Sequence, residues 1–566
     1  MASGIDESLI IWVAGLVLSG LFLLGTVAGL VRPVLPDATP ARWLGRLRRH
    51  FPSAARLGVI ALVLGTVLIV SAVVGGQVVG DQTGLSRAES TSTVAAQALA
   101  APAPAAVPGT VPDNGGRWLA GDMHTHTFLT GGTFPLADVA RNGLGKYGLD
   151  WMANSEHGGS ANWDPQGNPA PATPRWWSMM AWSWPIIDGL RPLYPGRVLF
   201  QATEWNVPKH GHAGVGFAYD DPSVVGEFDY RFDAKSSSTS FPGAPPKDNK
   251  TRQSAVSGIR WLQTNYPQRS YMVLNHPSRW LNYSPGDIRD FIEAGPDVVA
   301  GFEGMPGHQK QSNRGGYVWA NPLARTYQGA DVWLAQVGGV WDSILANGSR
   351  FHVFADSDFH GTRDEFWPGE YTKNWTYVER PDDVQSIIEG LKSGRSFTSH
   401  GDIIDGLRFY AQADGARVDM SRDALAVRRG DDVVVTIKFH TPAENNNDEK
   451  PSVDHLDLIA GSVIGPAAKG TASWEASTNP SAHVVGTFDS GALQELGDGW
   501  YAATYLLPRV EGPMYLRLRA TNVPRNTPGM TDIAGNPLMD PQSADGERTA
   551  WKTLWFYSNP IWIDIR

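Results

Sequence analysis

The sequence contains no cysteine among its 566 residues. This absence excludes a disulfide scaffold, a catalytic thiolate, a cysteine-bound zinc and an iron–sulfur cluster. Basic residues are outnumbered, with 47 Lys and Arg against 57 Asp and Glu, and the net charge of −10 argues against a nucleic-acid-binding protein. The chain also lacks a G-x-x-x-x-G-K-[ST] phosphate loop and a G-x-S-x-G turn. Any metal must therefore be bound by histidine and carboxylate side chains.

Charge is also scarce, at 18% of residues, and the uncharged stretches gather near the N-terminus. Residues 8–31 and 57–80 carry no charge, and each is long enough to cross a hydrocarbon core of about 30 Å. The segment between them holds six Arg and one Asp, a pattern typical of a cytoplasmic loop. We expect a transmembrane hairpin over residues 1–80, an Ala/Pro/Ser/Thr-rich linker over 81–115, and an extracytoplasmic remainder at the cell membrane. Cleavage of a signal peptide before residue 101 is the alternative.

From Arg117 to about residue 400, apolar runs of strand length alternate with helix-like segments. The runs are RWLAG, LDWMAN, VLFQAT, YMVL and FHVFA, and the helical patterns cover residues 135–148, 251–266, 285–295 and 337–348. This alternation is typical of an α/β fold with a parallel sheet, either closed into a barrel or doubly wound. Active sites in such folds lie at the C-terminal ends of the strands.

Metal-binding side chains follow each of the five apolar runs. His124 and His126 are two residues apart, so on a strand they point the same way and can bind one metal. Glu204 can bridge two cations through its two oxygens, and Asp122 is expected to hydrogen-bond an imidazole and fix its tautomer. The mixture of imidazole and carboxylate favours Zn, Mn or Fe over Ca or Mg. Further candidates near these strand ends are His157, His210, His212, His276, Asp358 and His360.

The motifs GDMHTHT, SEHGG, TEW with GHAG, NHP and ADSDFHG, over about residues 115–400, resemble the PHP (polymerase and histidinol phosphatase) superfamily of metal-dependent phosphoesterases. Two further stretches, VWDSILANGSRFHVFADSDFHG and IIEGLKSGRSFTSHG, resemble the secreted or membrane-associated subgroup that includes carbaryl hydrolase. The resemblance implies a distorted (β/α)7-type barrel over residues 116–400, with the metals at the C-terminal rim. One metal would be held by His124, His126, Glu204 and Asp358, a second by Glu204, His212 and His276, and a third by His157 and His360.

The chain departs from this family pattern at two places. Gly131 and Gly132 stand where many members have another His or Asp, and the usual Asp-His of the second motif is Glu156-His157. The third site therefore lacks part of its ligand set. We expect two divalent ions, or three if that site is complete, of Zn, Mn or Fe.

The pattern changes at about residue 401, where short alternating runs separated by Gly, Pro, Asn and Asp replace the helical period. Such runs predict an all-β, sandwich-like domain over residues 401–566. The histidines in or near it lack ligand spacing and are interpreted as structural, and residues 532–540 are interpreted as a turn rather than a calcium site. The histidines concerned are His400, His440, His455 and His483.

The expected function is a membrane-anchored, extracytoplasmic phosphoesterase that cleaves a phosphate mono- or diester with a hydroxide bridging two metals. Arg279 and Lys209 are candidates to contact a phosphate oxygen, and His210 is a candidate proton donor or a ligand in place of His212. The alternatives are a carbamate or carboxylic ester hydrolase with the same centre and a non-catalytic surface-binding protein. The expected partners are the membrane and a small-molecule, lipid head-group or cell-wall phosphoester, with no nucleic acid; the oligomeric state stays open. Most of the 22 tryptophans are expected in the core, with a substrate cleft as the alternative.

Overall fold

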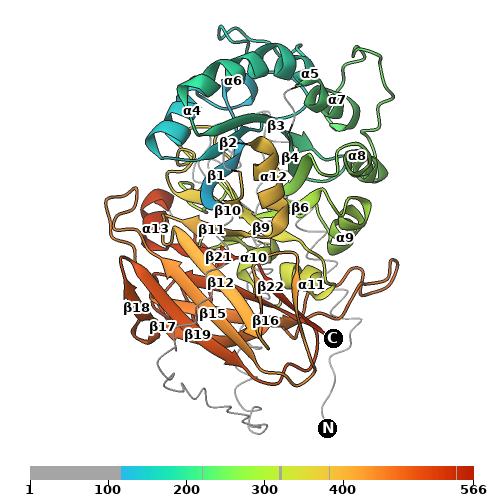
Figure 1. Ribbon diagram of the computed structural model, residues 1–566. Coiled ribbons are helices and arrows are strands. Elements are labelled where there is room, and N and C mark those ends of the chain that lie inside the picture. Colours follow the sequence, from blue (N-terminus) through green and yellow to red (C-terminus); the bar gives the residue numbers. More distant parts are fainter. Residues whose placement is uncertain (1–115, 219–220, 318–320, 381–382, 543–544) are drawn as a thin grey trace, which may run out of the picture. The chain divides into compact units, whose positions relative to one another are not determined.

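The computed structural model describes residues 116–566, except 219–220, 318–320, 381–382 and 543–544 (Figure 1). The first part contains strands β1 (Arg117–Thr125), β2 (Trp151–Asn154), β3 (Val198–Asn206), β4 (His212–Phe217), β5 (Ser270–Asn275), β6 (Val299–Met305), β7 (Thr326–Tyr327), β8 (Ala330–Asp331), β9 (His352–Ala355), β10 (Thr372–Val378) and β11 (Ser396–His400). Its α-helices are α4 (Leu136–Ala140), α5 (Arg175–Ser178), α6 (Trp184–Leu190), α7 (Ser223–Phe232), α8 (Arg252–Asn265), α9 (Pro285–Ala294), α10 (Val332–Ala335), α11 (Val340–Ala346) and α12 (Val384–Ser393). Helices α4 to α9 lie along the outer side of strands β1 to β6 (Figure 1).

The five apolar runs form strands β1, β2, β3, β5 and β9, and the four helical patterns contain α4, α8, α9 and α11. Local signals explain two of the helix starts. Thr251 caps α8 and Ser284 caps α9, each accepting from the backbone N–H three residues later. These capping boxes satisfy N–H groups that have no partner within the helix.

The strands form a mixed sheet rather than a parallel one. Strands β1, β2 and β3 pair in parallel, and so do β5, β6 and β9. Strand β4 lies between β3 and β5 and is antiparallel to both, and β10 is antiparallel to β1. The hairpin of β3 and β4 places Asn206 opposite His212, so the residues after Glu204 turn back toward the same sheet edge.

The prediction of a (β/α)7-type barrel followed by a separate sandwich is wrong. Strand β11 pairs antiparallel with β21 (Trp555–Ser558), with Phe397 opposite Ser558. This pairing joins strands from both halves of the described chain into one 15-stranded sheet, in which the order β14-β22-β20-β21-β11-β10-β1-β2-β3-β4-β5-β6-β9 runs from one half to the other. The residue pattern of a single strand does not show which edge it will pair with, so this connection could not be predicted.

The second part adds a five-stranded sheet in the order β13-β12-β15-β19-β18. Apolar side chains from this sheet, such as Phe409 and Ile437, share a buried core with Leu516 and Phe556 of the large sheet. One short helix, α13 (Gly546–Lys552), begins at its cap Asp545 where no helical period was expected. The strands are β12 (Gly406–Ala413), β13 (Ala416–Asp419), β14 (Ala424–Val427), β15 (Val433–His440), β16 (His455–Ser462), β17 (His483–Asp489), β18 (Gln494–Gly497), β19 (Trp500–Leu507), β20 (Met514–Thr521), β21 and β22 (Ile561–Ile565).

The prediction of a cell-membrane location with two transmembrane helices is also corrected. Within the described residues, no helix is long and apolar enough to cross a membrane. The 14 residues of α8 fall short of the roughly 20 that a spanning helix needs. The two predicted spans, residues 8–31 and 57–80, and the linker over 81–115 lie outside the described residues. The boundary at residue 400 stays a prediction.

Candidate metal centre

The C-terminal ends of neighbouring strands bring most of the predicted ligands together. His124 belongs to β1 and His126 follows two positions later, so both side chains leave the strand on the same side. The other residues come from the adjoining strands: His157 follows β2, Glu204 lies in β3, His212 begins β4, His276 follows β5, and Asp358 and His360 follow β9.

Four buried side chains form the first group: His124, His126, Glu204 and Asp358. Nε2 of His124 lies 2.9 Å from Nε2 of His126 and 3.1 Å from Oε1 of Glu204. Oδ1 of Asp358 lies 3.2 Å from Nε2 of His124 and 3.5 Å from Nε2 of His126. In a tetrahedral zinc site with bonds of about 2.0–2.1 Å, neighbouring ligand atoms are about 3.3 Å apart. The spacing of these atoms therefore fits one metal ion.

The protonation of His124 supports the same interpretation. Its Nδ1 lies 2.5 Å from Oε1 of Glu303, a pairing that keeps the proton on Nδ1 and directs the lone pair of Nε2 toward Glu204 and Asp358. The two carboxylate oxygens that face Nε2 favour a proton or a cation there, and although burial lowers the pKa of His124, Asp358 and Glu303 raise it well above its usual range. Glu303 thus holds the tautomer in which His124 can bind a metal.

Glu204 presents its two oxygens to different histidines. Oε1 lies 2.9 Å from Nδ1 of His212 and 3.3 Å from Nε2 of His276. Oε2 lies 2.5 Å from Nδ1 of His157, yet within the described residues neither of these two atoms has a hydrogen-bond partner. Asn275 donates to Oε1 and fixes the carboxylate plane. A buried carboxylate with nitrogen atoms on both sides is suited to bridge two cations.

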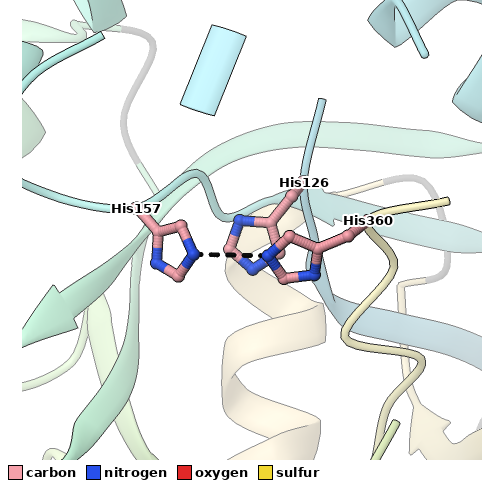
Figure 2. A group of neighbouring side chains, drawn as sticks. All are labelled: His126, His157 and His360. Atoms are coloured by element: carbon pink, nitrogen blue, oxygen red, sulfur yellow. Dashed lines mark hydrogen bonds between the residues drawn. The ribbon is translucent and has the colours of Figure 1, made fainter. Parts of the chain in front are cut away.

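A second and a third group share members with the first. His157, Glu204 and His212 lie close enough to hold one ion, as do His126, His157 and His360. Figure 2 shows the latter three, in which Nε2 of His360 lies 3.3 Å from Nε2 of His157. Gly131 is next to this group, since a Cβ built on it would lie 3.6 Å from Cδ2 of His360, but it offers no ligand atom. The expected grouping of Glu204 with His212 and His276 stays a prediction, since both histidines face Oε1 of Glu204.

Charge in the site favours metal-binding protonation states. Burial alone would raise the pKa of Glu204, but His212 and His124 beside it hold that pKa well below its usual range. Burial and the neighbouring His360 lower the pKa of His126 well below its usual range. Near neutral pH Glu204 is therefore ionised and His126 neutral, which are the forms that bind a divalent cation, whereas His124, whose pKa is raised, would release a proton when a metal binds.

Asp122 acts differently from the expectation. It was expected to hydrogen-bond an imidazole, but its oxygens accept from the backbone N–H groups of His124 and Ser357, at 3.0 and 3.2 Å. Burial raises its pKa to about 6. Because the Asp122 carboxylate is bonded to backbone N–H groups, the imidazole of His124 pairs with Glu303 instead. Asp122 thus ties the loop after β9 to the end of β1.

Three basic side chains expected near the substrate are placed elsewhere or already paired. Both terminal nitrogens of Arg279 donate to Oδ2 of Asp358 at 3.1 Å. His210 lies outside the cluster, because its Nδ1 donates to the carbonyl of Pro208 and its Nε2 lies 3.1 Å from Asp287. Lys209 is exposed. The roles predicted for Arg279 and His210 stay predictions.

Sequence reasoning assigned no metal-site role to Glu303, His308 or Glu365. Glu303 lies in β6, and its place in the run VAGFEGM is the same strand-end signal that identified Glu204. His308 and Glu365 come from the loops after β6 and β9, and with His360 they form a further group close enough to hold an ion. His308 follows the end of β6 at the same distance as Asp358 follows the end of β9, so the strand-end signal was present for it, whereas Glu365 lies far along the loop after β9 and carries no such signal.

Comparisons with known proteins add little. The chain matches no protein-family model and no curated protein. It is similar to the solved structure of a two-domain protein containing a predicted PHP-like metal-dependent phosphoesterase from Bacteroides vulgatus, with 13% identity over 76% of this chain and 96% of that chain and a TM-score of 0.33. A chitin binding domain from Burkholderia pseudomallei shows 12% identity over 25% of this chain and 57% of that chain, with a TM-score of 0.13. Both TM-scores are too low to bear on this chain, so membership of the PHP superfamily and its carbaryl hydrolase subgroup stays a prediction.

Proposed function

We propose that this protein is a metal-dependent hydrolase that cleaves a phosphate mono- or diester. The observation that carries the proposal is the position of Glu204, whose two oxygens face different histidines in a buried cluster. Two divalent cations held there would polarise the oxygens of a phosphoryl group and make a water molecule acidic enough to attack it near neutral pH. A site of this kind needs no protein nucleophile, in keeping with the absence of cysteine.

The side chains of the cluster divide into a closed and an open side. His124, His126 and His276 are at most 2% exposed and form the base of the site. The side chains of His157 and His360 are 27% and 24% exposed and form the side from which an ester could approach. Nδ1 of His360 donates to the carbonyl of Asp358, so its Nε2 is free of a proton and can accept one or bind a metal.

The test uses the full-length protein loaded with Zn²⁺ or Mn²⁺. Hydrolysis of a 4-nitrophenyl phosphate monoester and of a bis(4-nitrophenyl) diester is compared between wild type and Glu204→Gln. The variant should lose most of the rate, because an amide neither carries the negative charge nor bridges two cations as a carboxylate does. Equal rates in the two proteins would refute the proposal.

A parallel panel of 4-nitrophenyl acetate and an aryl N-methylcarbamate identifies the bond that is cleaved. Faster Glu204-dependent cleavage of these compounds than of either phosphate ester would keep the metal-dependent hydrolase and replace the phosphoesterase.

A further inference from the structure

One large, partly exposed aromatic side chain packs against the cluster. Trp280 follows His276 by four residues, and its ring centroid lies 5.0 Å from that of His276 and 5.1 Å from that of His212. The ring planes are nearly perpendicular, at 79° and 78°, so the indole meets both imidazoles edge to face. Although it contacts two cluster residues, Trp280 remains 40% exposed.

The backbone around Trp280 holds it in a defined position. His276 and Leu281 both have positive φ angles, 30° and 54°, which non-glycine residues rarely adopt. Between them, Ser278 is fixed by Asp331, which accepts from its N–H at 3.2 Å and its hydroxyl at 2.7 Å. Backbone conformations of this kind persist where the surrounding structure enforces them, and they are frequent at ligand sites. The indole is therefore presented to solvent by a constrained loop.

The surroundings of the indole favour an apolar, flat ligand group. Leu281, the next residue, is 45% exposed and adds apolar surface. Arg279, on the other side, donates to Asp358 and to the carbonyl of Gly315. Three of its five N–H groups are thus engaged, and its guanidinium carbon lies 5.8 Å from the centroid of the Trp280 ring.

We propose that Trp280 is a specificity-determining residue that stacks on an aromatic group of the substrate beside the ester being cleaved. This inference rests on the proposed hydrolysis and names the substrate class: a phosphate ester with an aryl substituent. Stacked aromatic rings gain binding free energy beyond that of their buried area, from which we expect a preference of about fivefold. The competing role is purely supporting, with the indole only holding His212 and His276 in place.

The test measures binding rather than turnover. Phenylphosphonate and methylphosphonate, which cannot be hydrolysed, are titrated calorimetrically into the metal-loaded full-length protein. Wild type should bind phenylphosphonate about fivefold more tightly. Trp280→Ala should bring the ratio of the two Kd values close to one while the Kd of methylphosphonate and the metal affinity stay nearly unchanged, and Trp280→Phe should keep part of the ratio.

The matched control is Trp177→Ala, since Trp177 in α5 is 42% exposed but packs on Trp182 and, among the described residues, contacts no member of the cluster. Trp177→Ala should leave the ratio of the two Kd values unchanged.

The inference is overturned if Trp280→Ala keeps the wild-type ratio, if Trp280→Ala weakens the binding of both phosphonates and of the metals equally, or if wild type binds neither phosphonate. Selective phenylphosphonate binding without hydrolysis of any ester would support the aromatic subsite and reject the proposed function, so the two failures are distinguishable.

Discussion

Nε2 of His308 lies 2.9 Å from Oδ2 of Asp358, and Nδ1 of the same ring pairs with Glu365. Arg279 donates to the same oxygen of Asp358. One oxygen of Asp358 is thus held by two basic side chains, while the other, Oδ1, faces His124 in the cluster. His308, backed by Glu365, and Arg279 therefore both hold Asp358 at the oxygen that faces away from His124.

Removing the support behind Asp358 should weaken metal binding. We expect Glu365→Gln and His308→Ala to lower the affinity for Zn²⁺ by about tenfold, because residues behind a ligand typically contribute a factor of about 10–100. Calorimetric titration of the metal-free protein checks this. The control is His440→Ala, which removes a histidine paired with Asp405 in the second part of the chain. Affinities equal to wild type in both test variants would mean that Arg279 alone positions Asp358.

Glu204 is the residue on which the metal count depends. Glu204→Gln should lower the number of bound Zn²⁺ or Mn²⁺ ions per chain by at least one, because one carboxylate serves two of the groups close enough to hold an ion. Elemental analysis by mass spectrometry after gel filtration measures the number. Glu293→Gln, which changes an exposed glutamate on α9, should leave it unaltered. A full metal count in Glu204→Gln would exclude the bridging role.

Much of the site could be predicted, because strand ends are local features. The apolar run before Asp122 and the alternation of His124 with His126 are both visible in the sequence, and the structure places them as expected. The pairing of His124 with Glu303 could not be predicted, since 179 residues separate them. The pairing of β11 with β21 could not be predicted for the same reason. Which distant strands pair depends on which sheet edges meet, and the residue pattern of a single strand does not contain that information.

A buried ion pair connects residues on the two sides of residue 400. Nε and one terminal nitrogen of Arg517 donate to the two oxygens of Asp342 at 2.9 and 2.7 Å, and both side chains are fully buried. Arg517→Ala leaves the carboxylate without its cation and should lower the free energy of unfolding by about 3–5 kcal/mol. Urea unfolding followed by circular dichroism measures the loss.

The control for this pair is Arg417→Ala. Arg417 pairs with Asp419 at the surface, where an ion pair contributes about 0–1 kcal/mol. Similar losses in the two variants would mean that the buried pair contributes no more than a surface pair. A loss confined to Arg517→Ala, with one unfolding transition instead of two, would indicate that the two sides of residue 400 unfold together.

His352 should make stability sensitive to acid. Burial, aided by the charges of Arg422 and Arg350, lowers the pKa of His352 from its usual 6.5 to about 3. In the unfolded chain this imidazole takes up a proton as the pH falls below about 6.5, whereas in the folded protein it stays neutral until about pH 3. Its contribution to stability is therefore complete above pH 6.5 and is lost progressively as the pH falls toward 3.

We expect the thermal midpoint of wild type to fall more steeply between pH 7 and 4 than that of His352→Leu, with both proteins in EDTA so that metal release does not contribute. His483→Ala, which removes an exposed histidine, should follow the wild-type curve. Parallel curves for wild type and His352→Leu would show that His352 titrates alike in the folded and unfolded chains.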